Sequence, residues 1–290
     1  SSAGIPHIYP EFIRREESIT EGIKQLREAK NEGLNSIIDV STIDLGRDIR
    51  LIEQVSRESG INIICATGTW RDIPRAFWNA TPDSVAKLYK REIEVGIEDT
   101  GIKAGIIKVA NDVGGVTREG EVILRAAART QKATGIPIST HTWAPDRVGE
   151  QQVRIFEDEG VDLNRVYIGH SNDTTDTFYL EGLMDNGVWL GLDRYPGGRS
   201  PGTPDWEGRT ETAMKLISDG YGKRIMLGHD WSVTLSIDSK EGQDTRKKSN
   251  PDGYLFITRK VLPRLREMGA SQEQLDDLMI NNPRRFFEGD

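Results

Sequence analysis

The sequence predicts an α/β fold in which helices cover a parallel sheet. Short apolar, β-branched segments alternate with longer helix-like segments along the whole chain, and this alternation is typical of βαβ units. The strand segments are apolar at successive positions rather than at every second one, as expected when helices cover the sheet. At 290 residues, with no linker-like stretch, the chain is long enough for one (β/α)8 TIM barrel.

Seven strands are predicted, each separated from the next by a helix. The expected strands are 36–40, 61–66, 105–109, 136–140, 166–169, 188–192 and 225–228. The expected helices are 19–32, 45–59, 82–97, 119–134, 150–159, 177–186, 210–219, 254–268 and 271–280. A barrel of this kind has eight strands. We therefore expect its first strand to precede residue 1, so that residues 1–290 form one N-terminally shortened barrel domain.

A doubly wound sheet is the alternative fold. It requires a glycine-rich phosphate loop after an early strand. The segments Val40-Ser41-Thr42 and Ala66-Thr67-Gly68, which follow the first two predicted strands, do not supply such a loop. The barrel is therefore favoured.

Composition limits the classes of partner. The chain has 38 Lys and Arg against 46 Asp and Glu, a net charge of −8, which disfavours nucleic acid and anionic membranes as partners. The single cysteine, Cys65, excludes an internal disulfide and a cysteine-based zinc cluster. No apolar run approaches the roughly 20 residues of a membrane span. We expect a small-molecule substrate and favour the cytoplasm, and a homodimer stays open.

Ionisable residues stand at the ends of several predicted strands. They are Lys108, His141, His170, Asp193, Arg194 and Asp230. Singly, each has a structural explanation, since a strand-end histidine is often a hydrogen-bond donor, a lysine can extend to the rim and an aspartate can cap a helix. Barrel enzymes, however, place their chemistry at the carboxyl ends of the strands. Imidazole and carboxylate together favour a site for zinc, iron, manganese or cobalt.

A lysine in such a site needs a separate reason, because an ammonium group does not bind a cation. Desolvation of Lys108 between apolar strand residues lowers its pKa and makes the neutral amine accessible. A neutral amine can add carbon dioxide and become a carbamate, which offers two anionic oxygen ligands. Such a group could bridge two metal ions about 3.5–4 Å apart, an arrangement that lowers the pKa of a shared water molecule.

Seven stretches along the chain carry a family resemblance. They are 96–108, Thr140-His141-Thr142, 149–152, 168–173, Gly191-Leu192-Asp193-Arg194, Asp230-Trp231 and Asn250-Pro251-Asp252-Gly253. In these stretches the sequence resembles the bacterial phosphotriesterase family of the amidohydrolase superfamily, which includes the phosphotriesterase-like lactonases.

The resemblance implies a binuclear metal site. Lys108 would be the carboxylated lysine that bridges two divalent ions, zinc first, with cobalt, manganese or iron as alternatives. His141 and His170 would bind the more exposed ion. Asp230 would bind the more buried ion and act as the catalytic residue that shuttles the proton. A metal-bridging hydroxide would then attack an ester phosphorus or a lactone carbonyl carbon.

Four further residues bear on the substrate. Arg194 stands where the lactonases carry arginine and efficient organophosphate hydrolases carry histidine, and we expect it to pair with Asp173 as a supporting residue. Trp70 resembles the phosphotriesterase tryptophan at the leaving-group pocket, and Trp231 follows the metal aspartate. The expected activity is metal-dependent hydrolysis of neutral esters, namely organophosphate triesters, aryl esters or lactones. The alternative is an N-acyl homoserine lactonase with promiscuous phosphotriesterase activity.

The largest departure from the family concerns its first strand. That strand ends in a His-x-His motif just before a Gly-Ser-Ser-Ala-Gly stretch, whereas this chain begins at Ser1-Ser2-Ala3-Gly4. His7 is expected to be a loop residue, and His229 to point away from the metals because strand side chains alternate. A fragment of a longer protein is the favoured explanation. A metal-free, inactive barrel is the second alternative.

Overall fold

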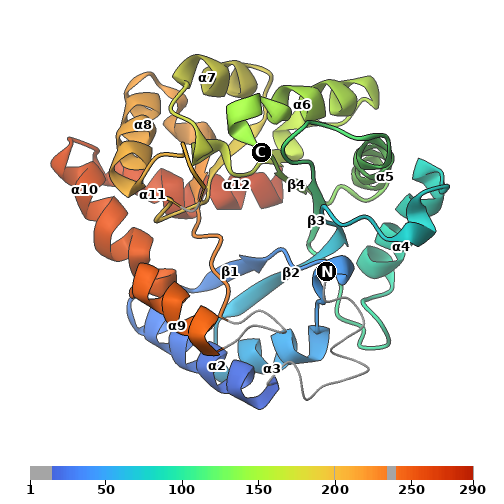
Figure 1. Ribbon diagram of the computed structural model, residues 1–290, viewed down its shortest axis with the longest axis horizontal. Coiled ribbons are helices and arrows are strands. Elements are labelled where there is room, and N and C mark those ends of the chain that lie inside the picture. The colour runs from blue at the N-terminus through green and yellow to red at the C-terminus, as the bar shows by residue number, and fades with distance from the viewer. Residues whose placement is uncertain (1–14, 199, 234–239, 290) are drawn as a thin grey trace.

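The computed structural model describes residues 15–198, 200–233 and 240–289. Seven parallel strands form one curled sheet in the order β1 to β7, and helices lie around its outside (Figure 1). The strands are β1 (Ser36–Asp39), β2 (Asn62–Thr69), β3 (Ile106–Ala110), β4 (Ile138–His141), β5 (Val166–Ile168), β6 (Trp189–Leu192) and β7 (Ile225–Leu227). This half-closed barrel confirms the predicted α/β architecture of the (β/α)8 type.

The longer helices alternate with the strands as predicted. They are α2 (Arg15–Asn31), α3 (Ile49–Ser59), α4 (Pro82–Glu94), α5 (Arg118–Thr134), α6 (Val148–Asp158), α7 (Thr177–Asp185) and α8 (Trp206–Ser218). After β7 come α9 (Lys240–Ser249), α10 (Leu262–Glu267), α11 (Gln272–Asp276) and α12 (Asn282–Glu288). None of the helices in the described ranges is long and apolar enough to cross a bilayer.

Capping explains where two helices depart from the predicted bounds. The helix expected from residue 45 begins at Ile49, because the Asp48 side chain caps it by accepting from the Leu51 amide. The helix expected from residue 210 begins at Trp206, because Asp205 caps it by accepting from the Gly208 amide. A carboxylate N-cap satisfies one of the amides that have no partner within the helix.

Parallel pairing brings the carboxyl ends of the strands to one edge. Lys108 of β3 lies opposite Ser139 of β4, and Ala110 lies opposite His141. All residues of β3, β4 and β6 are buried. Within the described residues, β1 and β7 are the outer strands of the sheet, and β1 is accordingly the more exposed.

Apolar side chains fill the opposite, amino end of the barrel. Phe286 of α12 packs against Trp189, the first residue of β6, with ring centroids 6.1 Å apart. It also lies 6.1 Å from the Tyr167 ring of β5. Ile106 and Met226 belong to the same buried cluster. The two ends of the barrel therefore differ in chemistry, and the polar site lies at the carboxyl end.

Candidate active site at the carboxyl ends of the strands

Lys108 is held inside the barrel by its position in the middle of β3. Its residue surface is only 4% exposed, and its Nζ donates to the backbone oxygen of Thr140 at 2.9 Å. Burial lowers the pKa of Lys108 to about 8, although the negative charges of Asp193 and Asp230 oppose this shift. A fraction of the amine is therefore unprotonated near neutral pH.

His141 ends β4 and is almost completely buried, at 2% exposure. Its ring meets the His170 ring edge to face, with centroids 4.4 Å apart. Burial lowers the pKa of His141 to about 3, so the imidazole is neutral at physiological pH. Neither ring nitrogen has a hydrogen-bond partner, although Nε2 lies at ion-pair distance, 3.4 Å, from Oδ2 of Asp112.

His170 follows β5 and is oriented by a carboxylate. Its Nδ1 lies 2.8 Å from Oδ1 of Asp193, and its backbone amide donates to the same oxygen at 2.7 Å. The Tyr167 hydroxyl donates to the other oxygen of Asp193 at 2.9 Å. Burial alone would raise the pKa of Asp193, but the adjacent His170 outweighs it and holds that pKa below its usual range.

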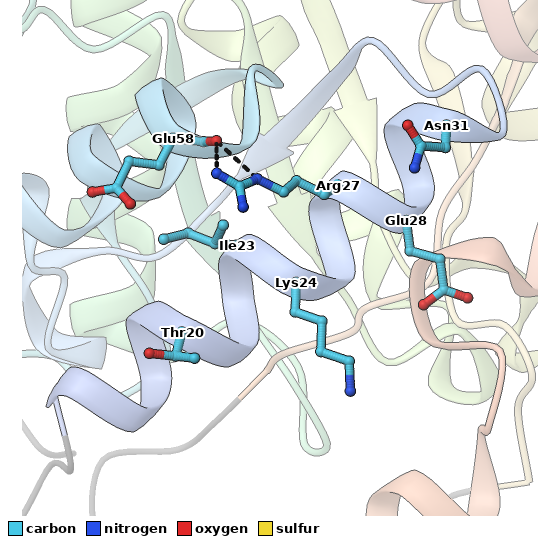
Figure 2. Close-up of a pocket in the computed structure, with 7 residues that line it drawn as sticks. All are labelled: Thr20, Ile23, Lys24, Arg27, Glu28, Asn31 and Glu58. Carbon is cyan, nitrogen blue, oxygen red and sulfur yellow. Dashed lines mark hydrogen bonds between the residues drawn. The ribbon is translucent and has the colours of Figure 1, made fainter.

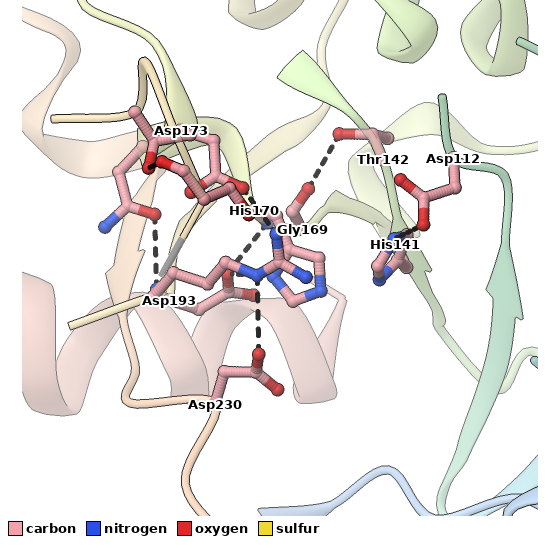
Figure 3. A network of polar contacts seen from close by, with 12 residues as sticks. Asp112, His141, Thr142, Gly169, His170, Asp173, Asp193 and Asp230 are labelled. Atoms are coloured by element: carbon pink, nitrogen blue, oxygen red, sulfur yellow. Dashed lines mark hydrogen bonds and ion pairs between the residues drawn. The ribbon is translucent and has the colours of Figure 1, made fainter. Parts of the chain in front are cut away.

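Asp230 belongs to a network of ion pairs at the same rim (Figure 3). The Nε of Arg194 lies 3.3 Å from Oδ2 of Asp230. The same guanidinium donates to the buried Asp173 at 2.5 Å, so the predicted pair is confirmed. Arg209 of α8 donates to the other oxygen of Asp173 at 2.8 Å. Two carboxylates therefore fix the position of Arg194.

His170 and Asp230 both have positive backbone φ angles, 61° and 46°. This left-handed region is uncommon for residues other than glycine. Such conformations cost roughly 1–3 kcal/mol and are concentrated at functional sites. Their occurrence within three residues of the ends of β5 and β7 supports a functional role for this rim.

The two predicted substrate-contacting tryptophans lie in different surroundings. The Trp70 ring meets the His141 ring edge to face at 5.6 Å. The indole nitrogen of Trp231 instead donates to the Gln25 side chain of α2 at 3.0 Å. Trp70 is thus part of the rim cluster. The Trp231 side chain contacts helix α2 instead, and a substrate-contacting role for Trp231 stays a prediction.

The structure gathers most of the predicted site residues at one rim. They are Lys108, His141, His170, Asp230, Arg194, Asp173 and Trp70. His229 points elsewhere, as expected, since its Nε2 accepts from the Ile257 amide and its ring meets that of Tyr254. His7 lies outside the described residues.

Other site residues received no role in the sequence analysis. Asp193 follows β6 directly and is among the strand-end residues of the sequence analysis, but its contact with His170 was not expected there. Asp112 lies two positions beyond β3 and could have been found from its place near a strand end. Tyr167 is a strand residue and Arg209 a helix residue, and no sequence signal marks their contacts with the site.

The donor types at this rim fit a divalent cation. The Nδ1 atom of His141 is buried without a hydrogen-bond partner, and buried polar atoms normally have one. Neutral imidazole and carboxylate are common ligands of zinc and related metals. Among the described residues, no three His, Cys, Asp or Glu side chains form a ready metal-binding group.

A surface groove of about 590 Å³ lies elsewhere on the molecule (Figure 2). It runs along α2 past Lys24 and Arg27 to Glu58, near the end of α3. The end of α3 comes just before the start of β2, so the groove lies toward the amino end of the strands. Its side chains carry both charges and lie apart from the rim cluster.

The parallel sheet and the ionisable residues at its carboxyl edge define an α/β-barrel enzyme. The model of the phosphotriesterase family matches residues 4–287. The chain therefore belongs to the phosphotriesterase family.

Similar proteins support the same conclusion. An aryldialkylphosphatase of Saccharolobus solfataricus is 35% identical over 284 residues, which cover 97% of this chain and 88% of that protein. A phosphotriesterase homology protein of Mycobacterium tuberculosis is 39% identical over 290 residues, covering 97% and 87%. An N-acetyltaurine hydrolase of Dictyostelium discoideum is 31% identical over 275 residues, covering 91% and 72%. Family membership and relatives named as hydrolases identify this protein as a hydrolase.

Proposed function

We propose that this protein is a metal-dependent hydrolase of neutral esters that acts at the rim formed by β3 to β7. Its candidate substrates are organophosphate triesters, aryl esters and lactones. The contact between the buried rings of His141 and His170, beside the buried Lys108 amine, is the observation that carries the proposal. The resemblance to an aryldialkylphosphatase supports the phosphotriester part.

His141, His170 and Asp230 would hold two divalent cations together with Lys108. Zinc is the first candidate, and cobalt, manganese or iron could replace it. Lys108 would contribute as a carbamate: the neutral amine forms an N–C bond to carbon dioxide and releases one proton. Its lowered pKa of about 8 supports this step. The bound cations would polarise the ester oxygen and lower the pKa of a water molecule.

The protein's own residues would then orient the reactants and move the proton. Asp230 is 39% exposed at its side chain, so it can meet both water and substrate, and its carboxylate would accept the proton of the attacking water. Arg194 would hold Asp230 through their 3.3 Å contact. Trp70 would provide an apolar wall against the leaving group beside His141.

A lactone is the second candidate substrate, as for an N-acyl homoserine lactonase with promiscuous phosphotriesterase activity. Arg194 favours a lactone substrate, because the lactonases carry arginine at this position. Contacts with two carboxylates hold its side chain in place. The relative named as an N-acetyltaurine hydrolase adds an N-acyl amide to the substrates worth testing.

Metal content and turnover test the proposal together. We expect about two divalent ions per chain after metal-replete growth. We also expect hydrolysis of an aryl dialkyl phosphate or a lactone, its loss on chelation and its recovery with zinc or cobalt. Asp230→Asn should abolish turnover, whereas Asp219→Asn, which alters an exposed ion pair of α8, should not. Activity that survives both chelation and Asp230→Asn would contradict the proposal, and a metal-free, inactive protein would favour the non-catalytic barrel.

A further inference from the structure

Asp112 lies on the loop between β3 and α5 and faces His141 (Figure 3). Its Oδ2 lies 3.4 Å from Nε2 of His141. The same oxygen accepts from Nη1 of Arg71 at 2.5 Å, and the Val113 amide donates to Oδ1 at 2.9 Å. The Arg71 guanidinium in turn lies 4.6 Å from the centroid of the Trp70 ring. Asp112 is thus held from two sides beside a buried imidazole.

The position of this carboxylate decides which nitrogen of His141 carries the proton. A neutral imidazole has one N–H and one lone pair, and the hydrogen bond made by one nitrogen sets the role of the other. The Asp112 oxygen nearest to Nε2 also accepts from the Arg71 guanidinium, so Asp112 faces the imidazole as an acceptor and not as a donor. Neither ring nitrogen makes a hydrogen bond within the described part of the protein, but Nε2 has the carboxylate 3.4 Å away. The proton is therefore favoured on Nε2, and the lone pair on Nδ1.

We propose that Asp112 is a positioning residue that holds His141 in the tautomer protonated at Nε2, so that Nδ1 is available to a divalent cation. Asp193 contacts Nδ1 of His170, so in that ring Nε2 is the nitrogen available to a cation. The two carboxylates therefore present opposite ring nitrogens of the paired histidines. Arg71 stabilises the arrangement by fixing Asp112. This inference rests on the proposed metal-dependent function.

Two substitutions and one matched control test it. Asp112→Asn keeps an acceptor oxygen and removes the charge, whereas Asp112→Ala removes both. Asp176→Asn is the control, because Asp176 pairs with Arg147 at 2.5 Å and Arg147 lies 5.6 Å from the Tyr179 ring. This arrangement reproduces the Asp112–Arg71–Trp70 contacts. An asparagine at position 176 also keeps the α7 N-cap.

The first measurement is the tautomer of His141 in the metal-free protein, read from long-range proton–nitrogen spectra of ¹⁵N-histidine-labelled samples. We expect the form protonated at Nε2 in the wild type and in the control, and a mixture of tautomers in Asp112→Ala. The second measurement is the affinity for Co²⁺ against a competing chelator. Loss of a carboxylate behind a metal-binding histidine typically costs about 10–100-fold. We expect that loss in Asp112→Ala and a smaller one in Asp112→Asn.

The two readouts separate this inference from a purely structural role and from the proposed function. A structural role would lower the melting temperature of the metal-free protein without changing the tautomer. An unchanged His141 tautomer and unchanged Co²⁺ affinity in Asp112→Ala would overturn the positioning role alone. Failure of the wild type to bind Co²⁺ would instead count against the proposed metal-dependent function, whatever the tautomer.

Discussion

The buried ion pairs of Asp173 lead to a quantitative stability prediction. Asp173 is 2% exposed and accepts from Arg194 at 2.5 Å and from Arg209 at 2.8 Å. Arg209 is itself only 1% exposed. Asp173→Ala would leave that guanidinium buried without its carboxylate, and removing one partner of a buried pair costs about 3–5 kcal/mol. We expect the free energy of unfolding to fall by that amount.

The size of the protein converts this energy into a temperature. An unfolding entropy of about 2.1 cal/mol/K per residue corresponds to about 0.6 kcal/mol/K for 290 residues. Asp173→Ala should therefore lower the melting temperature by about 5–8 °C in calorimetry or circular dichroism. Turnover should fall as well, because Arg194 would retain Asp230 but lose Asp173.

An exposed ion pair of similar length supplies the comparison. Lys215 and Asp219 lie 2.6 Å apart with side chains 56% and 36% exposed, and such exposed pairs contribute little to stability because water screens them. Asp219→Asn should therefore shift the melting temperature by less than about 1 °C. If Asp173→Ala melts within about 1 °C of the wild type, the assignment of Asp173 as the charge that compensates Arg209 is wrong.

Two further predictions concern the lysine and the tryptophan of the site. In metal-free, carbon-dioxide-free buffer, wild-type Lys108 releases its proton near its folded pKa of about 8, whereas the ordinary value is 10.5. The unfolded chain binds more protons between these values, so the wild type should gain about 3 kcal/mol of stability relative to Lys108→Met as pH rises from about 8 to 10.5. Denaturant unfolding at several pH values measures this difference, and parallel curves for the two proteins would refute it. Trp70→Ala should raise KM for an aryl ester about tenfold, equivalent to about 1.4 kcal/mol, with a smaller change in kcat because the ring packs beside His141. An alkyl ester serves as the control substrate, and an equal change in KM for both esters would argue against a wall for the aryl group.

Most of the sheet could be predicted from local pattern. Each predicted strand overlaps an observed one, and the predicted bounds differ by a few residues, as for β2, which extends to Thr69. The first residue of α3 was predicted less accurately than the strands. Ile43–Leu45 form a separate short 3-10 helix that Gly46 ends with a left-handed φ of 81°, and the apolar pattern does not distinguish that turn from the helix behind it. The tail is also more broken than expected, because a π-helical turn at Ile257–Val261 precedes α10.

Lys108, His141 and His170 could be grouped from their positions in the sequence alone. They occur at or near the ends of successive apolar strands, and parallel pairing necessarily brings such ends to the same edge of a sheet. The contacts of Asp112 with His141, of Arg209 with Asp173 and of Trp231 with Gln25 required the folded chain. Each of these contacts joins two segments that are not paired strands of the sheet. Trp231 and Gln25 are 206 residues apart in the sequence. The order of the strands follows from backbone pairing between neighbouring strands. The paths of loops and the directions of long side chains depend instead on how the helices pack against the sheet. Only the complete three-dimensional arrangement specifies that packing.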